Sequence, residues 1–148
     1  MIVRPATNDD LPTLVEMARQ FHAFAGFESL APFCAGSTEE TGRIIMEHGV
    51  FLVAEAAEGL VGMIGLMIAP VSHNHAFRQA VELMWWVNPG DRARGIATEL
   101  IAEAEAQAKA KGASTIMMIH LSNSPESAAR TYRSRGYGEL ETVYMKAI

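Results

Sequence analysis

Apolar residues recur at helical spacing in two stretches of the first third of the chain. Positions 11, 14, 18 and 21 are apolar, which predicts an amphipathic helix over residues 8–24 with Thr7 at its N-cap. Ser37 to Glu40 has the form of a capping box, so we expect a second helix to begin there. Residues 25–36, which contain Gly, Pro and Phe, are expected to form the loop between these helices.

The middle of the chain has the shorter apolar runs that are typical of strands. We expect strands at residues 2–5, 50–55, 60–68, 80–88 and 114–120. The runs at 50–55 and 60–68 should form a hairpin, and residues 70–79 should form a loop. If alternation is unbroken, Glu82, Met84 and Trp86 share one face of their strand.

Two later helices and an extended end complete the predicted order. One helix is expected over residues 96–111, stopped by Gly112, and another from the Ser124-Pro125 cap to about Arg135. Residues 137–148 are expected to be extended. The order β-α-α-β-β-β-α-β-α-β predicts an α/β fold of α+β type over residues 1–148, as a single domain. Its mixed sheet should be mostly antiparallel, with one β-α-β crossover and helices on both faces.

Composition excludes several classes of protein. The 148 residues are 49% hydrophobic and 20% charged, which is too apolar for a disordered chain. No apolar run reaches the roughly 20 residues of a membrane span, so we expect no membrane partner. The first residues lack an export signal, and the single Cys34, expected to be buried, cannot form an internal disulfide. These features predict a cytoplasmic protein.

Charge is divided unevenly along the chain. Residues 92–135 carry a net charge of +3, whereas the rest carries −8. A basic segment in an acidic protein favours a small polyanionic ligand on that segment, and the acidic remainder favours a cationic second ligand. A nucleic-acid interface would need a more basic domain, so no nucleic-acid partner is expected.

The most informative segment joins the predicted strand at 80–88 to the helix at 96–111. It reads Arg92-Ala93-Arg94-Gly95-Ile96-Ala97-Thr98, and its small residues would let backbone N–H groups converge at the positive end of a helix. Such a turn is an anion site. It is neither a P-loop nor a dinucleotide fingerprint, because the Lys-Ser/Thr ending and the Gly-x-Gly-x-x-Gly spacing are both absent.

Two segments of the chain resemble the GNAT superfamily of acyl-CoA-dependent N-acyltransferases. Arg92-Ala-Arg-Gly95-Ile-Ala97 is similar to the family's Arg/Gln-x-x-Gly-x-Gly/Ala pyrophosphate loop, with Val87-x-Pro89 before it. Ala128-x-x-Thr-Tyr132-Arg-Ser-Arg-Gly136-Tyr137 is similar to its Ala-x-x-Leu-Tyr-x-x-x-Gly-Phe segment. One position departs: the family often has Asn where Pro125 stands, and Asn123 lies two residues too early.

The resemblance implies an enzyme that moves an acetyl group from acetyl-CoA directly to an amine. Residues 92–98 would hold the pyrophosphate through backbone amides, Trp85, Trp86 and Val87 would pair with the pantetheine arm, and Asn123 is a further cofactor candidate. Glu82 is the candidate general base, and Tyr132 the candidate acid that protonates the departing thiolate. The alternatives are a charge on a solvated or paired strand face for Glu82 and simple packing for Tyr132.

Other residues point less clearly to chemistry. His73 and His75 have no cysteine or acidic third ligand nearby, so we expect no metal. The four phenylalanines Phe21, Phe24, Phe27 and Phe33 would line an acceptor pocket or pack in the core. The favoured acceptor is a small-molecule amine. A protein N-terminus or lysine, or a non-catalytic acyl-CoA sensor, are the alternatives, and the loops at 25–36 and 70–79 decide between a closed pocket and an open groove. A homodimer is among the assemblies such a chain could form.

Overall fold

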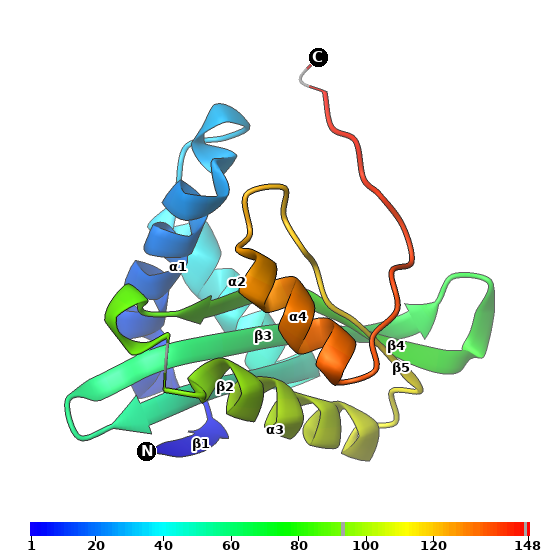
Figure 1. Ribbon diagram of the computed structural model, residues 1–148, viewed down its shortest axis with the longest axis horizontal. Helices are drawn as coiled ribbons and strands as arrows, with labels where there is room; N and C mark the ends of the chain where they lie inside the picture. The colour runs from blue at the N-terminus through cyan, green and yellow to red at the C-terminus, as the bar shows by residue number, and fades with distance from the viewer. Residues whose placement is uncertain (93, 147) are drawn as a thin grey trace.

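Five strands form one sheet in the order β1-β2-β3-β4-β5 (Figure 1). The computed structural model describes residues 1–92, 94–146 and 148. Neighbouring strands are antiparallel except for β4 and β5, which are parallel and are connected through a helix. The strands are β1 Ile2–Pro5, β2 Gly49–Ala56, β3 Gly59–Val71, β4 Asn74–Val87 and β5 Thr115–Met117.

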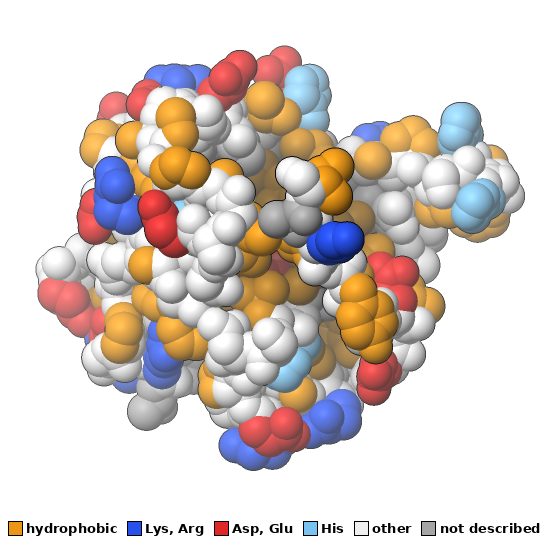
Figure 2. Space-filling model, turned by 90° about the horizontal axis from the view of Figure 1, so that it is seen from above, with side chains coloured by type: hydrophobic (Ala, Val, Ile, Leu, Met, Phe, Trp, Pro, Cys, Tyr) orange, Lys and Arg blue, Asp and Glu red, His pale blue; other side chains and the backbone are white. Residues whose placement is uncertain are grey.

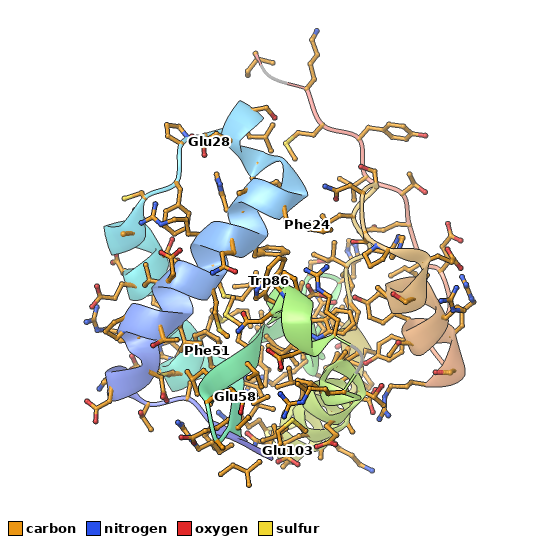
Figure 3. The ribbon with its side chains drawn as sticks, turned by 60° about the vertical axis from the view of Figure 1, so that its left-hand side comes forward. Phe24, Glu28, Phe51, Glu58, Trp86 and Glu103 are labelled. Carbon is orange, nitrogen blue, oxygen red and sulfur yellow. The ribbon has the colours of Figure 1, made fainter. Side chains whose placement is uncertain are left out.

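Helices cover both faces of this sheet, with α1 and α2 on one side and α3 and α4 on the other (Figure 3). This arrangement confirms the predicted mixed, mostly antiparallel sheet with one β-α-β crossover. The α-helices are α1 Leu11–Ala25, α2 Ala35–His48, α3 Ile96–Ala110 and α4 Glu126–Ser134. Short 3-10 turns are η1 Asn8–Asp10, η2 Phe27–Ser29 and η3 Pro89–Asp91.

The hydrophobic core is divided by the sheet into two clusters. On one face Leu100, Ile101 and Ala104 of α3 pack against alternate residues of β2 and β3. On the other face residues of α1 and α2 pack against the intervening positions of the same strands. A Cβ at Gly62 would lie 3.1 Å from Leu100 Cδ1, so this glycine lets α3 approach the sheet closely.

Residues 70–79, predicted as a loop, instead lengthen two strands, so that prediction was wrong. Strand β3 continues to Val71 and β4 begins at Asn74, which makes a hairpin that projects from the sheet (Figure 1). Pro70 has no N–H to donate, but it lies beside a register shift between Pro70 and Val71, where a regular ladder is already interrupted.

Helix α2 begins earlier than the capping-box pattern predicted. Cys34 is its N-cap, and Ser37 lies inside the helix with its hydroxyl donating to Cys34 Sγ at 3.2 Å. Cys34 is therefore exposed rather than buried as expected, because it stands at the outer end of a surface helix. The predicted capping box at Ser37 and the burial of Cys34 were both wrong.

The end of the chain has less strand than the predicted order. Strand β5 is shorter than the expected 114–120, and among residues 137–146 and 148 the chain forms no strand and leads away from the sheet (Figure 1). The final strand of the predicted order is therefore not formed in the part of the chain that the structure describes. None of the described helices is long and apolar enough to cross a membrane.

Candidate active site

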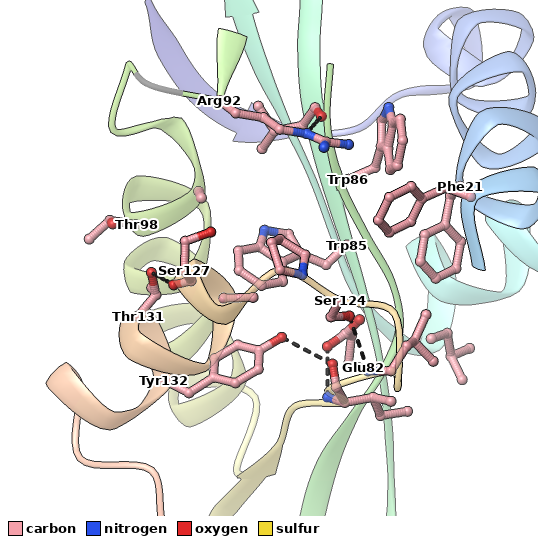
Figure 4. A pocket seen from close by; sticks show the side chains of 18 of the residues that line it. Phe21, Glu82, Trp85, Trp86, Arg92, Thr98, Ser124, Ser127, Thr131 and Tyr132 are labelled. Carbon is pink, nitrogen blue, oxygen red and sulfur yellow. Dashed lines mark hydrogen bonds between the residues drawn. The ribbon is translucent and has the colours of Figure 1, made fainter. Parts of the chain in front are cut away.

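A cavity of about 250 Å³ lies where β4 and β5 separate, and hydrophobic side chains surround a hollow on this side of the molecule (Figure 2). Its walls come from α1, β4, the start of α3, the segment after β5, and α4 (Figure 4). Three groups of residues line it. The first is the phenylalanines of α1 and η2, and the second is the β4 residues from Glu82 to Val87 except Met84. The third comes from the turn before α3, the start of α3, the segment after β5, and α4. The third group is Arg92, Gly95, Ala97, Thr98, Ile119, Leu121, Ser124, Pro125, Ser127, Ala128, Thr131 and Tyr132.

The strands separate because their pairing stops early. The β4–β5 ladder pairs Gln79 to Val81 with Thr115 to Met117 and goes no further. At the next step the Glu82 side chain takes the place of a backbone partner: its Oε2 accepts the N–H of Ile119 at 2.9 Å. Beyond this point the edge of β4 that would face β5 borders the cavity, which leaves backbone groups available to a ligand that lies along the strand.

A β-bulge in β4 sets which way Glu82 points. Glu82 pairs with Leu66 of β3, and Met84 pairs with the preceding residue Gly65, so Leu83 is the extra residue. Leu66 belongs to the α3 face of the sheet, whereas Met84 and Trp86 belong to the α1 face. The prediction that Glu82, Met84 and Trp86 share one face was wrong, because the bulge interrupts the alternation and turns Glu82 towards α4.

Glu82 is almost fully removed from solvent, with 4% of its surface exposed. Burial raises the pKa of its carboxyl group to about 7, and the hydrogen bond from the Ile119 N–H opposes that rise. No salt bridge to Glu82 is present among the described residues. The alternative of a solvated or paired charge does not describe this side chain, which can gain and lose a proton near neutral pH.

Tyr132 approaches the same peptide from α4. Its hydroxyl donates to the Ile119 carbonyl at 3.1 Å, and its ring lies 5.4 Å from that of Trp85 (Figure 4). The pKa of Tyr132 is raised, first by burial and then by the charge of Glu82. The hydroxyl therefore stays protonated over the physiological range. Glu82 and Tyr132, which are 50 positions apart in sequence, thus flank one peptide unit on the cavity wall.

The segment from residue 92 to residue 98 turns the chain into α3. Gly95 is the N-cap of this helix and has φ of +76°, a left-handed conformation that a side chain would strain. A Cβ at Gly95 would meet no atom within 4 Å, so this residue faces open space at the positive end of the helix. Ala97 and Thr98 line the cavity, whereas the Ile96 side chain is fully buried in the core. Ala93 lies outside the described residues.

The two arginines of this segment point to different surroundings. Arg92 Nε donates to the Val87 carbonyl at 3.1 Å, and its guanidinium lies 4.8 Å above the Trp86 ring, at the cavity. Arg94 is exposed and forms ion pairs with Glu58 at 2.5 Å and Asp91 at 2.6 Å. Arg94 does not line the cavity, so its side chain is engaged in holding the turn.

Trp85 and Trp86 project to opposite faces of β4 and both line the cavity. Each has a buried indole N–H that finds no hydrogen-bond partner within the described residues. Because an unpaired buried donor is unfavourable, these two groups suit a ligand that brings oxygen atoms into the cavity.

Asn123 does not line the cavity but fixes its rim. Its Nδ2 donates to the Phe24 carbonyl at 2.5 Å, which ties the segment after β5 to the end of α1. Leu121 and Ser124 on either side of it do line the cavity, and the Ser124 hydroxyl accepts the Leu121 N–H at 3.1 Å. The bond between Asn123 and Phe24 therefore joins two opposite walls.

Several residues of the site carry no signal in the sequence. Ile119 contributes its backbone N–H and carbonyl, which any residue has, and Leu83 contributes a bulge that depends on strand register. The Ser127 and Thr131 positions could have been found from their helical spacing with Ala128 and Tyr132. His73 and His75 lie far from the site on the projecting hairpin, and the described residues contain no group of three potential metal ligands.

Comparison with protein families gives a match to the acetyltransferase (GNAT) family model over residues 14–137. This match spans most of the chain and includes residues 92–97 and 128–137, the two segments whose sequence patterns resemble the family. The chain belongs to the GNAT acetyltransferase family. Comparison with curated proteins finds no match for this GNAT protein.

Solved structures share the fold of this GNAT protein at low sequence identity. A transcriptional regulator from Bacillus halodurans is 21% identical with a TM-score of 0.78, each chain being covered to 99%. A predicted acetyltransferase from Clostridium acetobutylicum, solved with acetyl-CoA, is 16% identical with a TM-score of 0.77, covering 99% of this chain and 95% of that one. An aminoglycoside acetyltransferase from a soil metagenomic sample, in complex with sisomicin, is 15% identical with a TM-score of 0.74 at the same coverage.

Proposed function

We propose that this GNAT protein transfers an acetyl group from acetyl-CoA directly to the amine of a small molecule. The observation that carries the proposal is one cavity that joins the N-terminus of α3 to the Glu82 and Tyr132 pair. The first feature suits the pyrophosphate, and the second supplies the proton carriers that amine acylation requires.

The residues around the cavity fit acetyl-CoA. The first N–H groups of a helix have no intrahelical acceptor, so those of Ile96 and Ala97 can bind phosphate oxygens beside the open space at Gly95. The unpaired Trp85 N–H suits a carbonyl or phosphate oxygen, and the free edge of β4 suits the amide groups of the pantetheine arm. Acetyl-CoA supplies the acetyl thioester, and the products are an amide, a free thiol and one proton.

Glu82 and Tyr132 have different tasks in this proposal. A substrate amine is mainly protonated at pH 7, and Glu82, with a pKa of about 7, takes the proton that the nitrogen must lose. As the new C–N bond forms and the C–S bond breaks, the Tyr132 hydroxyl gives its proton to the sulfur and regains one from solvent or from Glu82. No covalent enzyme intermediate is required.

A bridge across the rim of the cavity favours a small acceptor over a protein chain. The hydrogen bond from Asn123 to Phe24 connects the end of α1 to the segment after β5, which are two walls of the cavity. An extended polypeptide acceptor needs an open groove in which its backbone can lie. The similarity in fold to an aminoglycoside acetyltransferase is consistent with a small-molecule acceptor.

The test is product formation from acetyl-CoA and a broad panel of small amines. Thiol release and mass spectrometry of the acetylated amine should both report turnover by the wild-type protein. Glu82→Gln should reduce turnover at pH 7 by about 10²-fold while acetyl-CoA still binds. A protein that binds acetyl-CoA but acetylates no amine in the panel would instead be a sensor. Turnover with a peptide N-terminus or lysine alone would establish a protein acceptor.

A further inference from the structure

The part of the cavity on the α1 side is built from aromatic rings. We call it the aromatic half, and it consists of Phe21, Phe24, Phe27, Leu83 and Trp86. The Phe21 ring lies 5.9 Å from Phe27 and 6.4 Å from Trp86, and Phe24 lies 5.7 Å from Trp86, all edge to face. These contacts make one continuous aromatic wall opposite the α3 and α4 side (Figure 4).

Two members of the aromatic half leave much apolar surface in contact with solvent. Phe24 is 38% exposed and Leu83 is 42% exposed, and both border the same cavity. Leu83 is the bulged residue of β4, so the irregularity that aims Glu82 also presents this side chain to the cavity. Apolar surface gathered at one cavity, rather than scattered, indicates a ligand that covers it.

The charges at the cavity limit what this ligand can be. Among the described residues that line the cavity, Glu82 has the only carboxyl group and Arg92 has the only cationic side chain. A polycationic acceptor needs several carboxylates to bind its separate ammonium groups, and the guanidinium of Arg92 would repel them. The net charge of −5 belongs to the chain as a whole, whereas the cavity lining has one carboxyl group and one guanidinium and is not strongly acidic.

We infer that the acceptor is a monoamine with an aromatic body, of the arylalkylamine class. This inference rests on the proposed function. The ring packs edge to face against Phe24 and Trp86 and covers Leu83, while a short alkyl chain brings the single amine to the Glu82 carboxylate. Phe21, Phe24, Phe27 and Leu83 are then specificity-determining residues.

The experiment compares 2-phenylethylamine with ethylamine, spermidine and sisomicin as acceptors. The kcat/KM for 2-phenylethylamine should exceed that for ethylamine by on the order of 10²-fold, because a buried phenyl ring adds hydrophobic binding energy. Phe24→Ala should lower this ratio about tenfold. Phe77→Ala is the matched control: Phe77 is a 54% exposed phenylalanine of β4 outside the cavity lining, so the ratio should not change.

Binding measurements separate this inference from the proposed function. Calorimetry should show 2-phenylethylamine binding to the CoA-saturated protein, with a weaker affinity in Phe24→Ala and the wild-type affinity in Phe77→Ala. A preference for spermidine or sisomicin, with acetyl-CoA bound and an amine acetylated, would overturn the aromatic acceptor and leave the acetyltransferase intact. Equal use of ethylamine and 2-phenylethylamine would overturn it as well. A protein that binds no acetyl-CoA would overturn both.

Discussion

At Glu82, the proposed role in proton transfer and the stability of the fold have opposite requirements. Its charged form is unfavourable in a buried position, which is why its pKa rises to about 7, and the same rise makes it a useful base at neutral pH. A carboxyl group in a solvated position would be ionised at pH 7 but a weaker base. In the proposed mechanism, burial of Glu82 lowers folding stability at neutral pH and gives a carboxyl group that can transfer protons there.

The pH profile of turnover should report this carboxyl group. The kcat/KM of the wild-type protein should rise with pH through an inflection near 7, because only ionised Glu82 accepts a proton. In Glu82→Gln this inflection should vanish, leaving the slope that comes from the neutral fraction of the amine. An unchanged inflection in the variant would assign it to another group.

Folding stability should respond to the same substitution in the opposite direction. The folded pKa of Glu82 is raised from 4.5 to about 7, so its contribution is fully present below pH 4.5 and is lost as pH rises through 7. Glu82→Gln removes this loss and should stabilise the protein at pH 8 by up to about 3 kcal/mol, with a much smaller effect at pH 4. Urea denaturation at both pH values measures the difference, and equal changes at pH 4 and pH 8 would contradict it.

Tyr132 should separate packing from chemistry when its hydroxyl is removed. Tyr132→Phe keeps the ring beside Trp85, so acetyl-CoA affinity should stay within about twofold while turnover falls by on the order of 10²-fold. Calorimetry and steady-state kinetics give the two values. Wild-type turnover in this variant, with chemistry shown to be rate-limiting, would make Tyr132 a packing residue.

The two candidate proton carriers could be found from sequence, but their surroundings could not. Tyr132 stands in a recognisable motif, and Glu82 stands between apolar residues on a predicted strand. The direction of Glu82 depends on the bulge at Leu83, which is a property of how β4 pairs with β3. The roles of Ile119 and of the Asn123 side chain depend on contacts between segments far apart in sequence.

At the scale of single elements, the turn into α3 is the feature that can be tested most cleanly. Gly95 and Gly112 stand at opposite ends of this helix, with φ of +76° and +84°, and a Cβ on either meets no atom within 4 Å. Alanine at either position therefore introduces similar backbone strain, of about 1–2 kcal/mol. The two glycines differ in that only Gly95 lines the cavity.

Gly95→Ala should weaken acetyl-CoA binding at least tenfold, because the strained turn misaligns the helix N-terminus and the Cβ enters the ligand space. Gly112→Ala should lose similar stability and keep wild-type affinity. Calorimetry gives the affinities and thermal unfolding gives the stabilities. Equal affinities in the two variants would remove the phosphate-binding assignment from this turn.

The start of α1 is attached to the sheet by an ion pair. Arg4 of β1 donates to Asp10 at 2.8 Å and 2.9 Å, and this guanidinium lowers the pKa of Asp10 to about 2. The resulting stability is present above pH 3.8 and is lost as pH falls through 2. Asp10→Asn should destabilise the protein by about 2 kcal/mol at pH 7 and by much less near pH 2, as measured by urea denaturation. A destabilisation independent of pH would refute the role of this charge.

Elements with a clear pattern of apolar residues were predicted well, and elements without such a pattern were not. The helices α1 and α3 follow from their apolar spacing, and the β2–β3 hairpin follows from its two β-prone runs. Residues 70–79 contain a proline and polar residues, so they have the composition of a loop, and only pairing with each other makes them strands. Cys34 precedes the helix it caps without any of the usual capping chemistry.

At the scale of the whole molecule, the sheet places the proposed acetyl-CoA site and the proposed acceptor site on opposite sides of one strand. Consecutive residues of β4 point to opposite faces, so Trp85 packs towards the α3 and α4 side and Trp86 towards α1. The α3 side carries the turn proposed to bind phosphate, and the α1 side carries the aromatic half. In the proposed function, transfer would occur where the two sides meet, at the separation of β4 from β5.

Tryptophan fluorescence can report ligand binding at this cavity, because the two tryptophans of the protein, Trp85 and Trp86, both line it. A Trp86→Phe protein keeps the indole on the α3 side. Circular dichroism of this variant would show whether the fold is retained before ligand is added. Emission of Trp85 then reports events at the proposed acetyl-CoA site.

The most direct test of the central claim, that this cavity is the acetyl-CoA site, is a fluorescence titration of the Trp86→Phe protein with acetyl-CoA. We expect a saturable change in Trp85 emission, a curve shifted to at least tenfold higher ligand concentration when Gly95→Ala is added, and an unshifted curve when Gly112→Ala is added. No change in emission while calorimetry detects bound acetyl-CoA would mean that the ligand binds elsewhere, and would contradict the account.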